Sequence, residues 1–246
     1  MVTSMVRRKA PIMPSQSNTR AASPWSPFED WSPKLLKAKV YEQILLDIIF
    51  GELPPGGRLD EAALVKRYGA GLAGVRDALA RLALEGLVVR RARAGTTVAP
   101  IDLVDVRQAI DARRLIEPHC AALAATHATP EDIAAMRAAF ADAEGAIKAR
   151  DIRAIVDMDQ RFHVAMARAC RNATLARIVI PLQHKATRFW VYSMKEDTAA
   201  EQMEEVRRHL KIVDLIAAHD VEGARAAVVA ILTEFTQIAK RAASTP

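Results

Sequence analysis

Three side chains that commonly bind divalent metals occur in the second half of the chain. Asp159 and His163 are four residues apart within a helical pattern, so they share one helix face. His209 belongs to a later helical segment. A carboxylate and two imidazoles that meet between helices form a donor set for one divalent metal, such as Zn, Ni or Mn. The alternative is a hydrogen-bonded polar cluster without metal, and the residue types alone leave both open.

The region around these residues is expected to be an all-α antiparallel bundle. Residues 104–241 show a nearly continuous helical pattern without a strand signal. Thr129-Pro130 predicts a helix start, because Thr caps helices and Pro suits the first helical position. The breaks in the pattern predict helices at 104–127, 131–149, 152–170, 174–194, 200–218 and 221–241.

The first half of the chain has a different pattern, between residues 59 and 98. Two short helical segments are separated by a glycine-containing break at 69–71. Gly86 ends the second segment, and two β runs at 87–89 and 96–98 flank a basic turn. The apolar face of the second helix is expected to carry Val75, Leu79 and Leu82. This order predicts a winged helix-turn-helix, whose second helix enters a major groove and whose hairpin contacts phosphate or the minor groove.

The charge distribution agrees with a polyanionic partner for the first half. Residues 1–100 hold 15 Lys/Arg and 9 Asp/Glu, whereas residues 101–246 hold 20 of each, so the net charge of +6 lies in the first half. A basic surface that serves only solubility is the alternative. The predicted DNA-binding residues are Arg58, Arg76, Arg81, Arg90, Arg91, Arg93 and Gly95.

The chain resembles the GntR-type transcriptional regulators at these motifs. Residues 40–59, VYEQILLDIIFGELPPGGRL, are similar to that family's opening helix and its G-x-L-x-P-G-x-x-L turn. The later motifs that carry the resemblance are Gly69, Val75-Arg76-Asp77-Ala78-Leu79, Glu85-Gly86-Leu87-Val88 and Gly95. The resemblance covers about residues 35–100 and, more loosely, residues 104–241.

The second half resembles the FCD-type ligand domain of the FadR subfamily. The similar segments are Asp159–His163, which reads D-x-x-F-H, Asn172, and Arg113-Arg114-Leu115-Ile116-Glu117. Metal-binding members use one Asp and three His, and the metal helps to hold a small carboxylate effector. The resemblance therefore implies Asp159, His163 and His209 as ligands, with Ile231 at the position of the fourth.

The resemblance also implies an effector site. Arg113 matches a cavity-facing arginine that would hold a carboxylate with two hydrogen bonds, and Asn172 is a second predicted effector-binding residue. The alternative for Arg113 is an ion pair with Glu117 on the same helix. Three protein ligands leave one coordination position open for water or effector.

The recognition helix departs from the family pattern. Where the family reads S-R-T-P-V-R, this chain has residues 71–76, GLAGVR. A DNA-contacting arginine is replaced by Leu72, a second one by Ala62, and Arg76 is retained. These departures predict an operator that differs from the usual family half-site.

Composition excludes several other protein classes. No apolar run reaches the ~18 residues of a membrane span, and no secretory signal or standard enzyme motif is found. The two cysteines, Cys120 and Cys170, lie outside any C-x-x-C spacing, which favours reduced buried thiols in the cytoplasm.

These observations predict three parts: a disordered tail at 1–33, a winged helix-turn-helix at 34–100, and a helical effector-binding and dimerisation domain at 104–241. The predicted function is a cytoplasmic, homodimeric DNA-binding repressor controlled by a small organic acid, and not an enzyme. Two alternatives stay open: an effector-binding protein whose DNA affinity has decayed, and a metal-dependent enzyme in the bundle.

Overall fold

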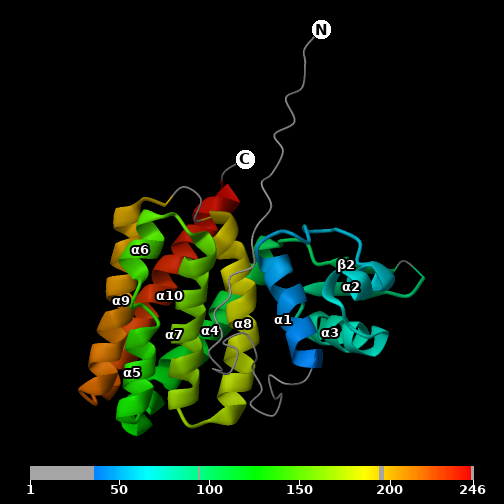
Figure 1. Ribbon diagram of the computed structural model, residues 1–246. Coiled ribbons are helices and arrows are strands. Elements are labelled where there is room, and N and C mark those ends of the chain that lie inside the picture. Colours follow the sequence, from blue (N-terminus) through cyan, green and yellow to red (C-terminus); the bar gives the residue numbers. More distant parts are fainter. Residues whose placement is uncertain (1–35, 94, 194–196, 245–246) are drawn as a thin grey trace.

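The computed structural model describes residues 36–93, 95–193 and 197–244 as two adjacent parts, a winged helix and a helical bundle (Figure 1). The tail predicted at residues 1–33 lies outside the described residues. No helix in the described part of the chain is both long and apolar enough to cross a membrane.

In the described part of the chain, the winged helix comprises three helices and a two-stranded antiparallel sheet. Its elements are α1 (Leu36–Ile49), α2 (Glu61–Tyr68), α3 (Leu72–Leu84), β1 (Val88–Arg91) and β2 (Gly95–Val98). The strands pair from Val88 opposite Val98 to Arg91 opposite Gly95. The predicted fold class, a winged helix-turn-helix followed by an all-α bundle, is confirmed.

Local sequence signals explain the ends of α2. Asp60 caps it, because its carboxylate accepts a hydrogen bond from the amide of Ala63 at 2.8 Å. Gly69 follows the helix with φ 60°, a left-handed conformation that glycine adopts without a steric cost. The predicted apolar face of α3 is buried, with Val75, Leu79 and Leu82 each at most 1% exposed. The burial of this face fixes α3 against α1 and leaves the polar face of α3 on the surface.

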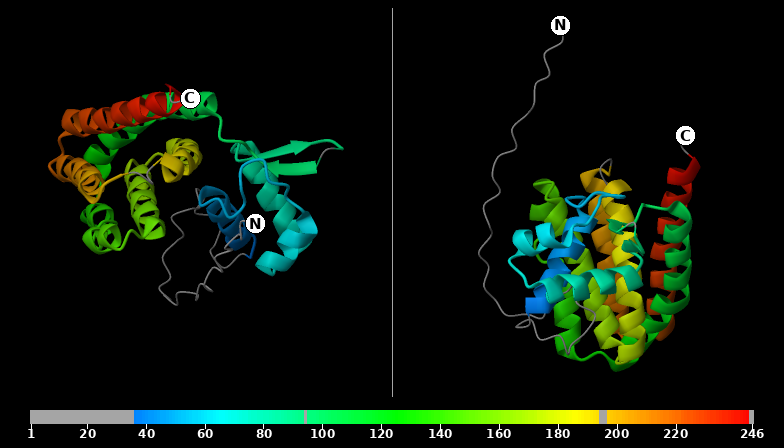
Figure 2. Two further views of the ribbon diagram at one scale, coloured as in Figure 1. Left: turned by 90° about the horizontal axis from the view of Figure 1, so that it is seen from above. Right: turned by 90° about the vertical axis from the view of Figure 1, so that its right-hand side faces the viewer.

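The bundle comprises seven helices among the described residues. They are α4 (Leu103–His127), α5 (Pro130–Ala138), α6 (Ala143–Lys148), α7 (Ile152–Ala169), α8 (Ala173–Ser193), α9 (Ala199–Ala217) and α10 (Val221–Ser244). The helix α4 packs against α10, α8 and α7, and α9 packs against α10 (Figure 2). Thr129 caps α5 and Pro130 takes its first position, as the sequence predicts.

The single helix predicted at 131–149 is wrong, because residues 139–142 interrupt it. No glycine or proline marks this break in the sequence. The interruption lies where Phe140 packs against the rings of Phe162 and His209, with centroids 5.6 Å away in both cases. Tertiary packing therefore overrides the local helical preference at this point.

Candidate functional site

The three predicted metal-binding side chains meet inside the bundle. Asp159 and His163 come from α7 and His209 from α9, and one donor atom from each lies within 4.8 Å of the others. Asp159 Oδ1 is 3.5 Å from His163 Nε2 and 3.6 Å from His209 Nε2. The two imidazoles are buried, at 7% and 3% exposed. The structure thus brings together the three residues selected from the sequence.

Packing and helix caps hold these side chains in place. Asp151 caps α7, and Thr198 and Glu201 form a capping box at the start of α9. The ring of Phe162 meets His209 edge to face, with centroids 4.9 Å apart. Because the surrounding rings are themselves buried, the imidazole of His209 has little freedom to turn.

The hydrogen bonding of His209 assigns its tautomer. Its Nδ1 lies 2.8 Å from the carbonyl oxygen of Glu205, so Nδ1 carries the proton and donates it. The lone pair is then on Nε2, which faces Asp159 and has no hydrogen-bond partner among the described residues. A backbone carbonyl that orients an imidazole in this way is typical of the surroundings of metal-binding histidines.

The electrostatics of the cluster keep Asp159 ionised. Burial by itself raises the pKa of this carboxyl, but the nearby His163, His209 and Arg113 outweigh it and lower the pKa to about 2. An ionised carboxylate is the form that binds a cation.

The donor set fits a divalent ion. Adjacent donors of a tetrahedral zinc, with bonds of ~2.0–2.2 Å, lie ~3.3–3.6 Å apart, and the two oxygen–nitrogen distances in the cluster are 3.5 and 3.6 Å. Ile231, at the fourth family position, is half-buried against the apolar core and offers no donor. These residues would hold an ion with three protein ligands.

Arg113, the predicted effector-binding arginine, already has a partner. Its Nε lies 2.5 Å from Glu117 Oε1 and its guanidinium makes a second contact at 3.2 Å with Oε2. Both side chains are buried, at 4% and 0% exposed. Glu117 Oε2 also lies 3.7 Å from His163 Nδ1, so the ion pair borders the cluster.

Asn172 is not brought to the cluster. It lies on the surface in the turn before α8, where its side-chain oxygen accepts a hydrogen bond from the amide of Leu175 at 3.1 Å. The helix α7 ends at Ala169, six residues or ~9 Å of helical rise beyond His163, and Asn172 lies past that end. Its observed role is to cap a helix.

Sequence reasoning missed Gln183 on α8. Its Nε2 donates a hydrogen bond to Asp159 Oδ2 at 3.0 Å, and its side chain is buried. Glutamine is an uncommon metal ligand and stands at no recognisable spacing from Asp159, so no sequence signal marks it.

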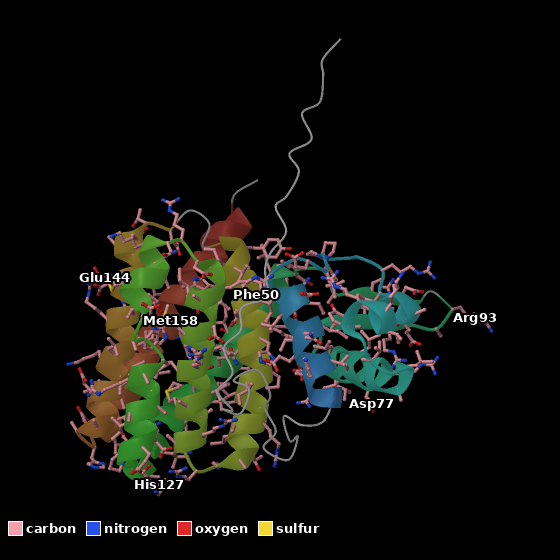
Figure 3. The ribbon with its side chains drawn as sticks, in the orientation of Figure 1. Phe50, Asp77, Arg93, His127, Glu144 and Met158 are labelled. Carbon is pink, nitrogen blue, oxygen red and sulfur yellow. The ribbon has the colours of Figure 1, made fainter. Side chains whose placement is uncertain are left out.

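The wing carries the largest group of predicted DNA-binding residues. An isolated bridge between Arg58 and Thr97 places the preceding turn beside β2. Arg93 lies at the tip of the wing, far from the bundle (Figure 3). An open hollow of about 450 Å³ is lined by Arg58, Arg90, Arg91, Ala92, Arg93, Gly95 and Thr96. Four of the residues that line this hollow are arginines, which favours binding of phosphate.

The exposed face of α3 has one arginine. Arg76 is 58% exposed in its side chain and lies 2.7 Å from Glu61 on α2. Leu72 is 43% exposed at the start of the same helix, and Ala62 is exposed on α2. The positions where the family pattern has arginines are therefore on the surface but carry apolar side chains.

Arg81, which the sequence predicts to bind DNA, points toward the protein interior in this structure. Its side chain is only 12% exposed, its Nε lies 3.2 Å from Glu85 Oε1, and its guanidinium stacks 4.4 Å from the ring centre of Tyr41. Helical spacing alone left its direction open, and Glu85 one turn later attracts it inward.

Comparison with known proteins agrees with this architecture. Residues 36–98 match the family of bacterial regulatory proteins called the gntR family, and residues 108–234 match the FCD domain. The chain is 28% identical over 211 residues to the transcriptional regulator LutR of Bacillus subtilis, covering 76% of this chain and 94% of LutR. It is also 28% identical to a probable D-xylose utilization operon repressor of Paenarthrobacter nicotinovorans, covering 75% and 80% of the two chains.

Solved structures show the same fold. Escherichia coli McbR/YncC superposes with a TM-score of 0.75 at 22% identity, covering 85% of this chain and 99% of that one. A GntR regulator from Rhodococcus superposes with a TM-score of 0.66 at 21% identity, with the same coverage. The winged helix, the helical bundle and these matches together show that the chain belongs to the gntR family of transcriptional regulators with a C-terminal FCD domain.

Proposed function

We propose that this regulator binds an operator as a homodimer, with α3 in the major groove and the wing against the DNA backbone. Arg76 and the four arginines that line the hollow of the wing are all exposed on one small module, which supports this placement on DNA. Two half-sites need two recognition helices related by a two-fold axis, which is why a dimer is required.

The bundle is proposed to bind one divalent ion and one small carboxylate. Arg113 and Glu117 cancel each other's charge, which leaves the negative charge of Asp159. A divalent ion added to the cluster makes the net charge +1, and one carboxylate neutralises it. The open coordination position left by Ile231 would accept a carboxylate oxygen. Metal and carboxylate are therefore expected to strengthen each other's binding.

The alternative of decayed DNA affinity rests on the exposed Leu72 and Ala62, which donate no hydrogen bond to a base. Leucine can contact a thymine methyl, so we favour altered sequence preference over lost binding. Selection of duplexes from a random pool, followed by salt-dependent titration, distinguishes the two.

The expected result is a two-fold symmetric site that differs from the usual family half-site where Leu72 lies, with an affinity that falls steeply with salt. Sedimentation should show two protomers per duplex. If no sequence is enriched and the affinity stays in the nonspecific range of ~10⁻⁴–10⁻⁶ M, DNA-binding control is not the function of this chain.

A further inference from the structure

The helix α8 contacts both parts of the molecule. It packs against α7 and α4 inside the bundle and also contacts α1 of the winged helix. The views from the front and from above both place it between the bundle and the winged helix (Figures 1 and 2). A change in the bundle that moves α8 therefore reaches the DNA-binding part directly.

One side of α8 is attached to the metal-binding cluster. Gln183 donates to Asp159 Oδ2 at 3.0 Å, whereas Oδ1 of the same carboxylate faces His163 and His209. The carboxylate is thus shared between the cluster and α8. An ion that binds Oδ1 would draw this carboxylate toward the imidazoles and change the hydrogen bond that holds Gln183.

The next residue of α8 contacts the end of the recognition helix. His184 is fully buried, and its Nδ1 lies 3.6 Å from Glu85 Oε2. Glu85 is the C-cap of α3 and also accepts the hydrogen bond of the Tyr41 hydroxyl, whose oxygen lies 2.8 Å from Oε1 and 2.7 Å from Oε2. Because these groups are buried together, α8 and the end of α3 are joined by polar contacts of defined geometry.

Two more side chains of α8 contact the first turn of α4 and the winged helix. Lys185 Nζ lies 2.8 Å from Asp105, and a Cβ added to Gly86, just after α3, would lie 2.7 Å from the same Nζ. Arg188 donates to the carbonyl oxygen of Ala99, just after β2, at 2.6 Å. Residues 183–188 therefore contact the cluster, the end of α3 and the end of the wing.

Pro181 weakens α8 directly before this segment. Proline lacks an amide proton, so the carbonyl of Arg177, four residues earlier, loses its helical donor. Helices bend most readily at such positions.

We propose that residues 183–188 of α8 transmit the state of the Asp159–His163–His209 cluster to α3 and the wing. Gln183 is the input, and the contacts of His184, Lys185 and Arg188 form one cooperative output, so that loss of the Lys185 contact alone interrupts it. The inference rests on the proposed function of the cluster. The cluster with a bound divalent ion and the cluster without one favour different positions of α8. The end of α3 and the wing move with α8.

The first test uses zinc alone and a selected operator. The ratio of operator dissociation constants without and with Zn²⁺ is measured for wild type, Gln183→Leu, Lys185→Met and the exposed α8 control Arg177→Gln. Wild type and the control Arg177→Gln should show a ratio of about ten. Gln183→Leu and Lys185→Met should show a ratio within about twofold of one. Calorimetry should show that Lys185→Met still binds zinc. The proposal is overturned if Lys185→Met and Gln183→Leu both bind zinc and both show the same ratio of dissociation constants as wild type. It is also overturned if wild type binds zinc but shows a ratio of one.

The second test needs neither metal nor DNA. It therefore shows whether residues 183–188 transmit a change in the cluster even if the proposed function fails. Hydrogen exchange of residues 84–99 is compared in wild type, Asp159→Ala, Lys185→Met and the double variant, each checked for folding by circular dichroism. If residues 183–188 transmit the state of the cluster, Asp159→Ala should change the exchange rates of these residues by at least about threefold in an otherwise wild-type protein. The same substitution should not change these rates when Lys185→Met is also present. No change in either background, or additive changes, would overturn it even if wild type binds no zinc.

Discussion

Arg113 and Glu117 form a buried ion pair one helical turn apart on α4, with Nε 2.5 Å from Oε1. The arginine that would hold a carboxylate effector is therefore already neutralised by a carboxylate of the protein. This relationship makes the charge of the neighbouring Asp159 cluster decisive for effector binding.

The substitution Glu117→Gln should test whether Glu117 neutralises the charge of Arg113. The substitution leaves the Arg113 guanidinium buried without its counter-charge, which should lower the free energy of unfolding by on the order of 3 kcal/mol. Acetate should restore part of this stability in the variant without added metal, but should not stabilise metal-free wild type. Thermal unfolding with and without acetate measures both effects. The exposed pair control Glu222→Gln should lose less than about 1 kcal/mol. Equal stabilisation of wild type and Glu117→Gln by acetate would contradict this charge balance.

Stability at acid pH should depend on Glu85. Burial raises the pKa of its carboxyl, but contacts with His184, Tyr41 and Arg81 outweigh burial and lower the pKa below its ordinary value of 4.5. A lowered folded-state pKa stabilises the protein above about pH 4.5, and this contribution is lost as the pH falls below that value.

Glu85→Gln should therefore be less stable than wild type at pH 7, by roughly 1–3 kcal/mol. The difference should shrink at pH 3.5, because Glu85 is then protonated in unfolded wild type and increasingly in the folded state. Urea unfolding at the two pH values measures it, with the exposed Glu144→Gln as control. A difference that stays constant between pH 7 and pH 3.5 would show that the ionised form of Glu85 contributes nothing.

Arg76 should contribute to operator binding and little to folding. Arg76→Ala is expected to weaken operator binding by about 1–3 kcal/mol if it reads a base edge. Its exposed pair with Glu61 contributes ~0–1 kcal/mol to stability, so the unfolding midpoint should hardly change. Fluorescence anisotropy with labelled operator measures the loss, and Arg207→Ala on the bundle surface is the matched control. Wild-type affinity in Arg76→Ala would remove Arg76 from the proposed interface.

Ile231→His should tighten metal binding. The chain turns between α9 and α10 at residues 218–220, and positions 209 and 231 lie on either side of that turn at similar distances. An imidazole at 231 would supply the fourth protein donor and close the open position, which should slow metal exchange. Calorimetry with Zn²⁺ on wild type, Ile231→His and Ile231→Leu, the isosteric control, measures the change. Zinc affinities equal within about twofold in wild type and Ile231→His would show that position 231 does not face the cluster.

The Asp159–His163 pair could be predicted because its geometry follows from helix periodicity, whereas His209 on α9 was grouped with this pair by the resemblance to the FCD-type ligand domain. The four-residue spacing of Asp159 and His163 fixes their common face, and the apolar pattern on α7 shows which face is buried. The face of α3 was predictable for the same reason. Helix caps such as Asp60 and Thr129 were readable because capping needs only local residues.

Relations between helices could not be predicted in the same way. Gln183 contacts Asp159, and Arg81 turns toward Tyr41, because of how neighbouring helices are rotated about their axes. Periodicity within one helix does not determine that rotation. Cys120 and Cys170 likewise lie in one buried cluster although they are far apart in the sequence. The sequence indicated buried thiols but offered no signal that they are neighbours.

We propose that the Asp159–His163–His209 cluster controls operator affinity through a bound divalent ion. The most direct measurement is an anisotropy titration of the selected operator with wild type and His163→Ala, each with and without saturating Zn²⁺. We predict that zinc changes the wild-type dissociation constant about tenfold and leaves that of His163→Ala unchanged. An unchanged wild-type dissociation constant, or an equal change in both proteins, would contradict the claim.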